Sequence, residues 1–185
     1  MLASRSPQRR AILAQLGVDF RVVEPDVEEL TTGDPRAVVL ENATRKARAV
    51  AGELVLGVDT EVVLDRQVFG KPGDAAEAEQ SLGRLSGRTH TVLSGLCLRD
   101  DGGERISSAE TLVRFRSLTA EEIRWYVATG EWRGRAGGYA IQGRGAALVE
   151  SIEGDYWNVV GLPVAELMRL RPDLPRAPET RPGAS

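Results

Sequence analysis

Cysteine and histidine are nearly absent from the 185-residue sequence, which holds one of each, Cys97 and His90. A single cysteine cannot form a disulfide within the chain, and a zinc site needs more cysteines and histidines than are present. A serine–histidine–aspartate triad would have to use His90, which lies in the alternating apolar stretch 89–98. Any active site must therefore be built from carboxylates, lysines, arginines, hydroxyls and amides.

Long apolar runs and an excess of one charge are also lacking. No run approaches the about 18 residues of a membrane helix, and the first residues do not resemble a secretory signal. We therefore expect a cytoplasmic protein with no membrane partner. The 24 Lys and Arg against 27 Asp and Glu give a net charge of −3, without a basic stripe, so we expect no nucleic-acid partner. This charge balance is compatible with a small anionic ligand, because a pocket needs only a few converging cations.

What is present predicts an α/β fold with a mixed sheet. Hydrophobic residues make up 42% of the chain and aromatic residues only 5%, which indicates a sizeable aliphatic core in one domain over residues 1–171. The Pro-rich segment 172–185 is predicted to be disordered. Periodicity and capping residues predict strands at 1–3, 18–24, 54–58, 62–64, 68–69, 89–98, 110–115 and 148–152, and helices at 7–16, 35–51, 75–85, 119–128 and 163–170.

The segment from Ser4 to Arg10 has the makings of an anion site. Ser6 suits a helix N-cap and Pro7 the first helical position, so the positive end of the helix and its free N–H groups would face the loop before it. Ser4 and Ser6 add hydroxyl donors. Arg9 and Arg10 in the first turn oppose the helix dipole, an unfavourable arrangement that an anionic ligand would offset. The alternative is an ordinary capped helix with solvated arginines.

Two carboxylates and two lysines are candidates for catalysis. Asp59 follows the apolar run 54–58, and ligands of α/β proteins often lie at strand ends. It could hold a metal ion or act as a general base, or it could simply start a turn. Glu29, after the second predicted strand, could supply a second carboxylate. Lys46 and Lys71 could bind phosphate or be solvated, and the neighbours of neither indicate a buried ion pair.

A glycine-rich stretch supplies the last candidate. Residues 130–145 include six glycines, which predicts a shaped loop, and Gln142 within it offers an amide donor and acceptor for a base edge. The phosphate-loop pattern ending in Gly-Lys-Ser/Thr is absent. Taken together, the candidates are the groups that triphosphate hydrolysis needs, namely carboxylates, cations and an anion-binding helix end.

The sequence resembles the Maf-like family over residues 2 to about 170. The motifs that carry the resemblance, in their order along the chain, are Leu2–Pro7, Lys46-Ala47, Gly57–Thr60, Gly70–Pro72, Leu85–His90, Ala136–Gly143 and Asn158–Pro163. The resemblance implies an elongated α/β fold like that of inosine triphosphate pyrophosphatases, with two lobes around a nucleotide cleft. It also implies hydrolysis of nucleoside triphosphates to the monophosphate and pyrophosphate, with Mg²⁺ or Mn²⁺.

The resemblance further implies roles for single residues. Asp59 would accept a proton from water, and Asp59 and Glu29 would hold the metal. Thr60 and Gln142 resemble the branch that prefers dTTP and UTP rather than the one acting on 7-methyl-GTP. Gln8 stands where that branch usually has arginine, which predicts a relaxed base preference, although Arg10 could substitute. The full predicted set is Asp59, Lys71, Lys46 and Glu29 for catalysis, and Ser4, Ser6, Gln8, Arg9, Arg10, Thr60 and Gln142 for substrate binding.

Three further expectations come with the resemblance. The protein would remove modified nucleotides, would be linked to cell-division arrest, and could form a homodimer. Because only three residues precede Ser4, we expect a short first strand. The alternative hypothesis is a non-catalytic nucleotide-binding regulator of septum formation, against which the presence of Asp59 and both lysines counts.

Overall fold

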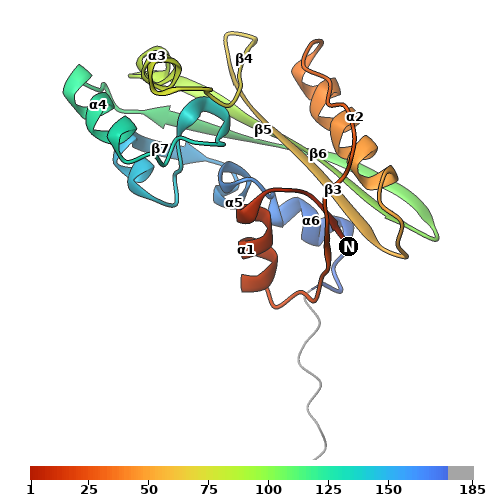
Figure 1. Cartoon of the computed structure of the whole chain (residues 1–185). Helices are drawn as coiled ribbons and strands as arrows, with labels where there is room; N and C mark the ends of the chain where they lie inside the picture. The colour runs from red at the N-terminus through yellow and green to blue at the C-terminus, as the bar shows by residue number, and fades with distance from the viewer. Residues whose placement is uncertain (175–185) are drawn as a thin grey trace, which may run out of the picture.

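The computed structural model describes residues 1–174, which form one seven-stranded mixed sheet with helices on its faces (Figure 1). The strand order is β2-β1-β3-β5-β6-β7, and β4 pairs with β3. The strands are β1 (Leu2–Ala3), β2 (Val22–Val23), β3 (Val55–Leu64), β4 (Gln67–Phe69), β5 (Thr89–Asp100), β6 (Gly103–Phe115) and β7 (Val149–Glu153). The helices are α1 (Pro7–Gln15), α2 (Pro35–Arg48), α3 (Ala75–Leu85), α4 (Ala120–Ala128), α5 (Tyr156–Val160) and α6 (Val164–Leu170), with 3-10 turns η1 (Ala136–Gly138) and η2 (Arg144–Leu148).

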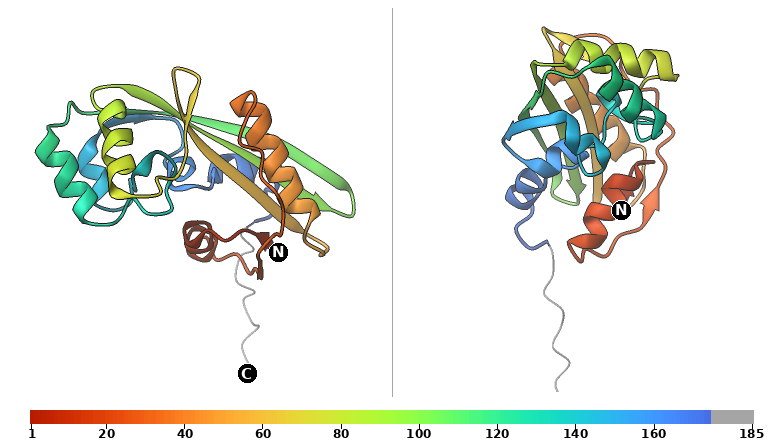
Figure 2. Two further views of the ribbon diagram at one scale, coloured as in Figure 1. Left: turned by 45° about the horizontal axis from the view of Figure 1, so that its top comes forward. Right: turned by 90° about the vertical axis from the view of Figure 1, so that its left-hand side faces the viewer.

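The molecule is elongated because β3, β5 and β6 run along its length. Helices α3 and α4 lie at one end, and α2 lies beside the other, as two orientations show (Figures 1 and 2). The first lobe holds α1, α2 and α6 against β1 and one half of the long strands. The second lobe holds α3, α4, β4, β7 and the two 3-10 turns against the other half. This arrangement confirms the predicted α/β fold.

Strand β3 connects the cores of both lobes through one of its faces. Leu56 and Val58 lie in the first-lobe core with residues of α1 and α6, and Val62 and Leu64 lie in the second-lobe core with residues of α3 and α4. Since strand side chains alternate between faces, Thr60 points to the same side as these four residues, between the two cores. It stands at the point where the apolar packing is interrupted.

The edge of β3 is uncovered at the same point. Strand β1 pairs with β3 only at Leu56 and Gly57, and β4 pairs only from Val62 to Leu64. Within the described part of the chain, no strand covers residues 58–61 on that side, although β5 pairs along the whole of the other side. Side chains from α1 and from loops can therefore reach Asp59 and Thr60 across this edge.

The register of the strands corrects two predictions. The strand predicted at 54–58 continues to Leu64, so Asp59 lies within β3 and not at its end. The polar residues 59–61 interrupted the apolar pattern, but the antiparallel ladder with β5 carries the strand through them. Strand β6 begins at Gly103 and not at 110, because it pairs with β5 up to Asp100 while carrying polar side chains at 104, 105, 107 and 108.

Other predicted elements also differ from the structure. Strand β2 is two residues long, where 18–24 was predicted, because its partner β1 is equally short. Helix α2 ends at Arg48, where 51 was predicted. Helix α5, capped by Asp155, was missed because five residues show no helical period.

Most of the tail predicted at 172–185 lies outside the described residues. Among residues 1–174, no helix is both long and apolar enough to cross a bilayer.

Candidate active site

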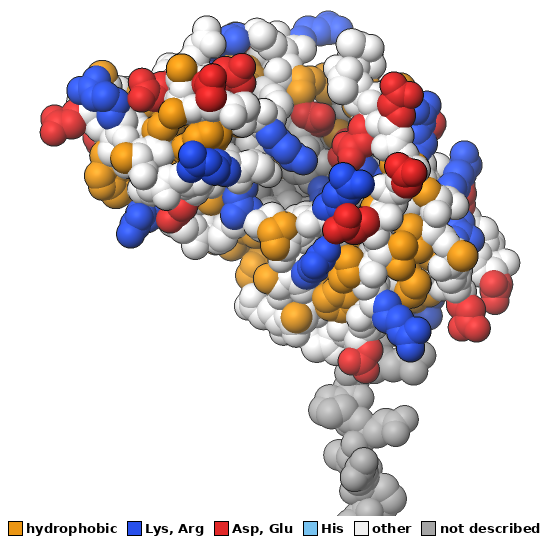
Figure 3. Space-filling model, viewed as in Figure 1, with side chains coloured by type: hydrophobic (Ala, Val, Ile, Leu, Met, Phe, Trp, Pro, Cys, Tyr) orange, Lys and Arg blue, Asp and Glu red, His pale blue; other side chains and the backbone are white. Residues whose placement is uncertain are grey.

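A cavity of about 390 Å³ opens between the two lobes, beside the uncovered edge of β3. Figure 3 shows it as a hollow with Lys and Arg side chains at its rim. Its size falls in the usual range for small-molecule sites. All the sequence-predicted site residues except Arg10 line it, namely Ser4, Ser6, Gln8, Arg9, Glu29, Lys46, Asp59, Thr60, Lys71 and Gln142. The guanidinium of Arg10 lies 3.8 Å from the carboxylate of Glu24, outside the cavity.

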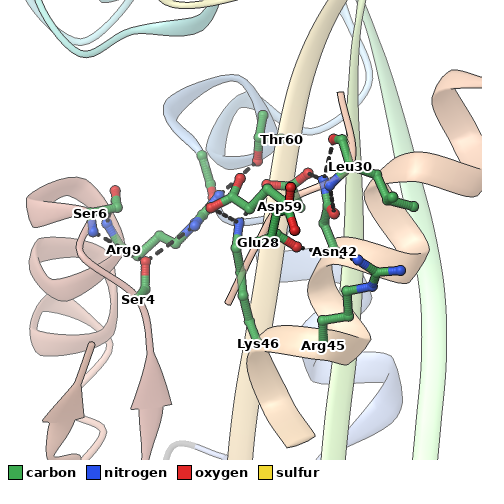
Figure 4. A network of polar contacts seen from close by, with 12 residues as sticks. Ser4, Ser6, Arg9, Glu28, Leu30, Asn42, Arg45, Lys46, Asp59 and Thr60 are labelled. Atoms are coloured by element: carbon green, nitrogen blue, oxygen red, sulfur yellow. Dashed lines mark hydrogen bonds and ion pairs between the residues drawn. The ribbon is translucent and has the colours of Figure 1, made fainter. Parts of the chain in front are cut away.

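A buried carboxylate and a buried lysine form the centre of the site (Figure 4). The Lys46 ammonium donates to Asp59 Oδ1 at 2.7 Å and lies 3.0 Å from Glu29 Oε1. Asn42 Nδ2 donates to the other oxygen, Asp59 Oδ2, at 3.0 Å. Both lysine and asparagine come from α2, one helical turn apart, so a single helix face holds both oxygens of Asp59.

This geometry corrects the expectation that Lys46 has no buried ion-pair partner. The side chains of Lys46 and Asp59 are only 7% and 8% exposed. Burial opposes ionisation of Asp59, but Lys46, Asn42 and Arg9 outweigh it and hold the pKa of Asp59 below its ordinary value. Asp59 is therefore an ionised carboxylate in a mostly dry setting, oriented by two donors.

Helix α2 can hold Asp59 because it lies unusually close to the sheet. A Cβ atom on Gly57 would come within 2.1 Å of the carbonyl oxygen of Ala43, and one on Gly95 within 2.2 Å of that of Val39. Both glycines thus give the helix backbone room to rest on β3 and β5. The short separation brings the side chains of Asn42 and Lys46 within bonding distance of Asp59.

The N-terminus of α1 forms the opposite wall of the cavity. Ser6 caps the helix by accepting from the Arg9 N–H at 3.4 Å, as predicted, and its hydroxyl donates to Gln8 Oε1 at 3.0 Å. Arg9 donates to Gly161 O, Ser4 Oγ and Thr60 Oγ1 at 2.9, 3.1 and 3.2 Å. Burial lowers the pKa of Arg9, whereas Asp59 and Glu29 raise it. The buried guanidinium thus ties α1 to β3 and brings positive charge to the site.

Several residues of the site were missed by sequence reasoning. Asn42 could have been found, since it lies four residues before Lys46 on a helix. Glu61 could also have been found, since it follows Asp59 by two residues in a strand. Burial and the carboxylates of Asp59 and Glu29 raise the pKa of Glu61 to about 7, against the opposing effect of Lys71 and Lys46.

Two more residues, Arg135 and Tyr139, line the cavity from the glycine-rich loop. The Tyr139 hydroxyl lies 2.8 Å from Nε2 of His90 in the second-lobe core. No periodic signal marks either residue, because the loop has no regular period. The loop itself, predicted from its glycines, is confirmed, and it contains the 3-10 turn η1 and the start of η2.

The oxygen atoms of Asp59 and Glu29 suit a hard divalent cation. No group of three or more Asp, Glu, His or Cys side chains able to hold a metal ion occurs within residues 1–174. Mg²⁺ is commonly bound by one or two carboxylates together with substrate phosphates, and not by a cage made of protein alone. The two carboxylates therefore fit a metal that arrives with, or is completed by, a phosphate ligand.

Comparisons with known proteins identify the family of this chain. Residues 1–172 match the family described as Maf-like protein. A dTTP/UTP pyrophosphatase of Symbiobacterium thermophilum is 51% identical over 176 residues, which cover 92% of this chain and 91% of the relative. A protein of the same name from Thermococcus onnurineus is 46% identical over 175 residues, 92% of this chain and 95% of the relative. The chain therefore belongs to the Maf-like family.

Proposed function

We propose that this protein hydrolyses nucleoside triphosphates to the monophosphate and pyrophosphate, with dTTP and UTP as its best substrates. The observation that carries the proposal is the ionised, buried Asp59 in a cavity that also holds several cations and a helix N-terminus. The names of the relatives support the same reaction and the same bases. A binding protein without turnover would have no need for an oriented carboxylate of this kind.

In the proposed reaction, Asp59 orients a water molecule for attack on the α-phosphorus. Each oxygen of Asp59 accepts one bond from α2 and keeps a lone pair for the water. As the new P–O bond forms, the bond from the α-phosphorus to the bridging oxygen breaks, and the proton of the attacking water then passes to the carboxylate. Pyrophosphate leaves with the electron pair. Because the pKa of Asp59 is low, its principal contribution is orientation and charge, and proton transfer follows bond formation.

The cations and the helix end receive the triphosphate. Lys71 and Arg9 neutralise phosphate charge, and the free N–H groups of α1 add donors. Asp59 and Glu29 are the residues that would hold Mg²⁺ or Mn²⁺, which when bound would polarise phosphate oxygens and neutralise their charge. Gln142 and Thr60 lie on the same cavity and are the proposed contacts to the pyrimidine base.

The cytoplasm is the proposed location, because nucleoside triphosphates are made and used there and because Cys97 is a free, buried thiol. The nucleotide is the proposed partner, with no nucleic acid or membrane. Homodimer formation, removal of modified nucleotides and a link to cell-division arrest stay predictions.

Product analysis tests the reaction. The protein is incubated with dTTP, UTP, CTP, ATP, GTP and 7-methyl-GTP, with Mg²⁺, Mn²⁺ or a chelator, in water enriched in the heavy oxygen isotope. We expect pyrophosphate and isotope-labelled monophosphate, with dTTP and UTP leading, and loss of activity with the chelator. Release of inorganic phosphate, or label in the pyrophosphate, would overturn the proposal.

The control is Asp59→Asn, which keeps the size of the side chain but removes its charge. We expect its turnover to fall at least about 10²–10³-fold while its circular dichroism spectrum stays unchanged. A folded variant with wild-type turnover would remove Asp59 from the mechanism.

A further inference from the structure

The cations around the cavity differ in whether the protein already neutralises them. Lys46 is paired with Asp59 and Glu29, and Arg5 with Glu24 at 3.3 Å. Arg9 forms no ion pair within residues 1–174, but each of its three guanidinium nitrogens already donates a hydrogen bond to a neutral oxygen atom. Within residues 1–174, Lys71 and Arg135 are the remaining Lys and Arg side chains on the cavity, and neither forms an ion pair. Their charge is free to attract a ligand.

Arg135 is in an unfavourable position for a guanidinium without a ligand. It is half-buried, and its Nε is buried with no hydrogen-bond partner. Burial lowers the pKa of Arg135, against smaller opposing effects of Tyr126 and Glu131. Glu131 accepts from the Arg144 backbone N–H at 2.8 Å and makes no ion pair with Arg135. Leaving a buried donor unsatisfied is unfavourable, and more so for a charged group, so a bound anion would relieve Arg135 of this penalty.

The backbone holds Arg135 on the same wall as Lys71. Gly137 donates its N–H to the carbonyl of Gly70 at 3.1 Å, which joins the loop of Arg135 directly to the loop of Lys71. Gly137 and Gly138 have φ values of 69° and 72°, which glycine adopts readily. Side chains of Val62 and Pro72 fill the space beside them. Arg135 is thus presented by a fixed turn and not by a loose loop.

We propose that Arg135, together with Lys71, binds the β- and γ-phosphates of the substrate and stabilises the departing pyrophosphate. This inference rests on the proposed function. The two cations come from the second lobe, whereas Asp59, Lys46 and Arg9 come from the first. The scissile bond would then lie between a first-lobe group that orients water and a second-lobe pair that receives the leaving group. The planar, forked guanidinium suits two phosphate oxygens at once.

The test compares Arg135→Gln and Arg135→Lys with a matched control, Arg144→Gln. Arg144 is an exposed arginine of the same glycine-rich loop and does not line the cavity. Two quantities are measured for each folded variant: kcat/KM for dTTP, and the dissociation constant for inorganic pyrophosphate by calorimetry. For Arg135→Gln we expect a tenfold to hundredfold loss in both quantities. Arg135→Lys should recover part of each loss, and Arg144→Gln should match the wild type.

The outcomes separate this inference from the proposed function. If the wild type turns over dTTP and Arg135→Gln keeps wild-type values of both quantities, the inference is wrong and the proposed function stands. If Arg135→Gln loses kcat/KM while its affinity for pyrophosphate is unchanged, Arg135 does not receive the leaving group and the inference also fails. If the wild type hydrolyses no triphosphate, the proposed function fails first, and with it the reaction in which Arg135 would act.

Discussion

At the scale of single residues, Lys46 and Lys71 differ in how deeply they are tied into the protein. Lys46 is buried between Asp59 and Glu29, and its removal would leave the buried carboxylate of Asp59 without its closest counter-charge. Lys71 is exposed at the cavity and has no ion pair within the described residues. A lysine that takes part in function can therefore also stabilise the fold. Mutation of Lys46 and mutation of Lys71 should thus affect activity and stability differently.

We predict that Lys46→Met loses both activity and stability, whereas Lys71→Met loses activity alone. Breaking a buried ion pair by removing one partner costs about 3–5 kcal/mol, because the other charge stays buried. The free energy of unfolding from urea titration and the turnover of dTTP are measured for both variants. Equal stability of the two variants would contradict the structural role assigned to Lys46.

Gln8 allows a second test at this scale. It lines the cavity and accepts a hydrogen bond from Ser6, so a side chain at this position can reach the substrate. We predict that Gln8→Arg raises the ratio of kcat/KM for dTTP over that for ATP by roughly tenfold, the value of one good hydrogen-bonding contact. An unchanged ratio would show that position 8 does not influence base choice.

The sequence predicts which residues line the cavity better than it predicts their surroundings. Their positions near expected strands and helices, together with the family resemblance, predict Asp59, Lys46 and Glu29, and the structure brings the three side chains together. Their burial could not be predicted, because it depends on how α2 and the uncovered edge of β3 meet in space. Arg135 was missed for a related reason, since its lack of a partner becomes visible only when all neighbouring carboxylates are placed.

At the scale of elements, the close packing of α2 on β3 and β5 determines the geometry of Asp59. Local signals predicted the start of α2 at Pro35, and the structure shows Asp34 as its N-cap. The extent of β3 was not predicted, since long-range pairing with β5 overrides the polar residues within it. The importance of Gly57 and Gly95 likewise follows from contacts between elements distant in sequence.

We predict that Gly57→Ala displaces α2 and damages the site. The added methyl would meet the backbone of Ala43 and Ala47, which cannot move without shifting the helix. Overpacking of this kind typically costs about 1–3 kcal/mol, and a shift of Asn42 and Lys46 would weaken their bonds to Asp59. The melting temperature and the turnover of dTTP should both fall.

The matched control is Gly83→Ala in α3, where a Cβ would meet nothing within 4 Å. This change should raise stability by up to about 1 kcal/mol through helix propensity, with unchanged turnover. If Gly57→Ala behaved like Gly83→Ala, close packing of α2 would not be what positions Asp59.

At the scale of the whole molecule, a hydrogen bond joins a buried histidine of the second lobe to the wall of the cavity. His90 is buried, packs edge-on against Phe115 with ring centroids 5.0 Å apart, and bonds the hydroxyl of Tyr139, a residue of the cavity wall. Its Nδ1 has no partner within the described chain. Burial alone lowers the pKa of His90 from 6.5 to about 4, so the ring is neutral in the folded protein at pH 7.

This lowered pKa predicts how stability depends on pH. Between pH 6.5 and pH 4 the unfolded chain binds a proton at His90 that the folded protein does not, so the His90 contribution to stability falls as the pH falls. Between pH 7.5 and pH 5 the loss should be about 2 kcal/mol. His90→Gln keeps a hydrogen-bonding group for Tyr139 but cannot titrate. We therefore expect the wild type to lose about 2 kcal/mol more than His90→Gln over this range, measured by urea unfolding. All other titrating groups are common to both proteins, so parallel stability curves would mean that His90 is protonated in the fold or reached by solvent.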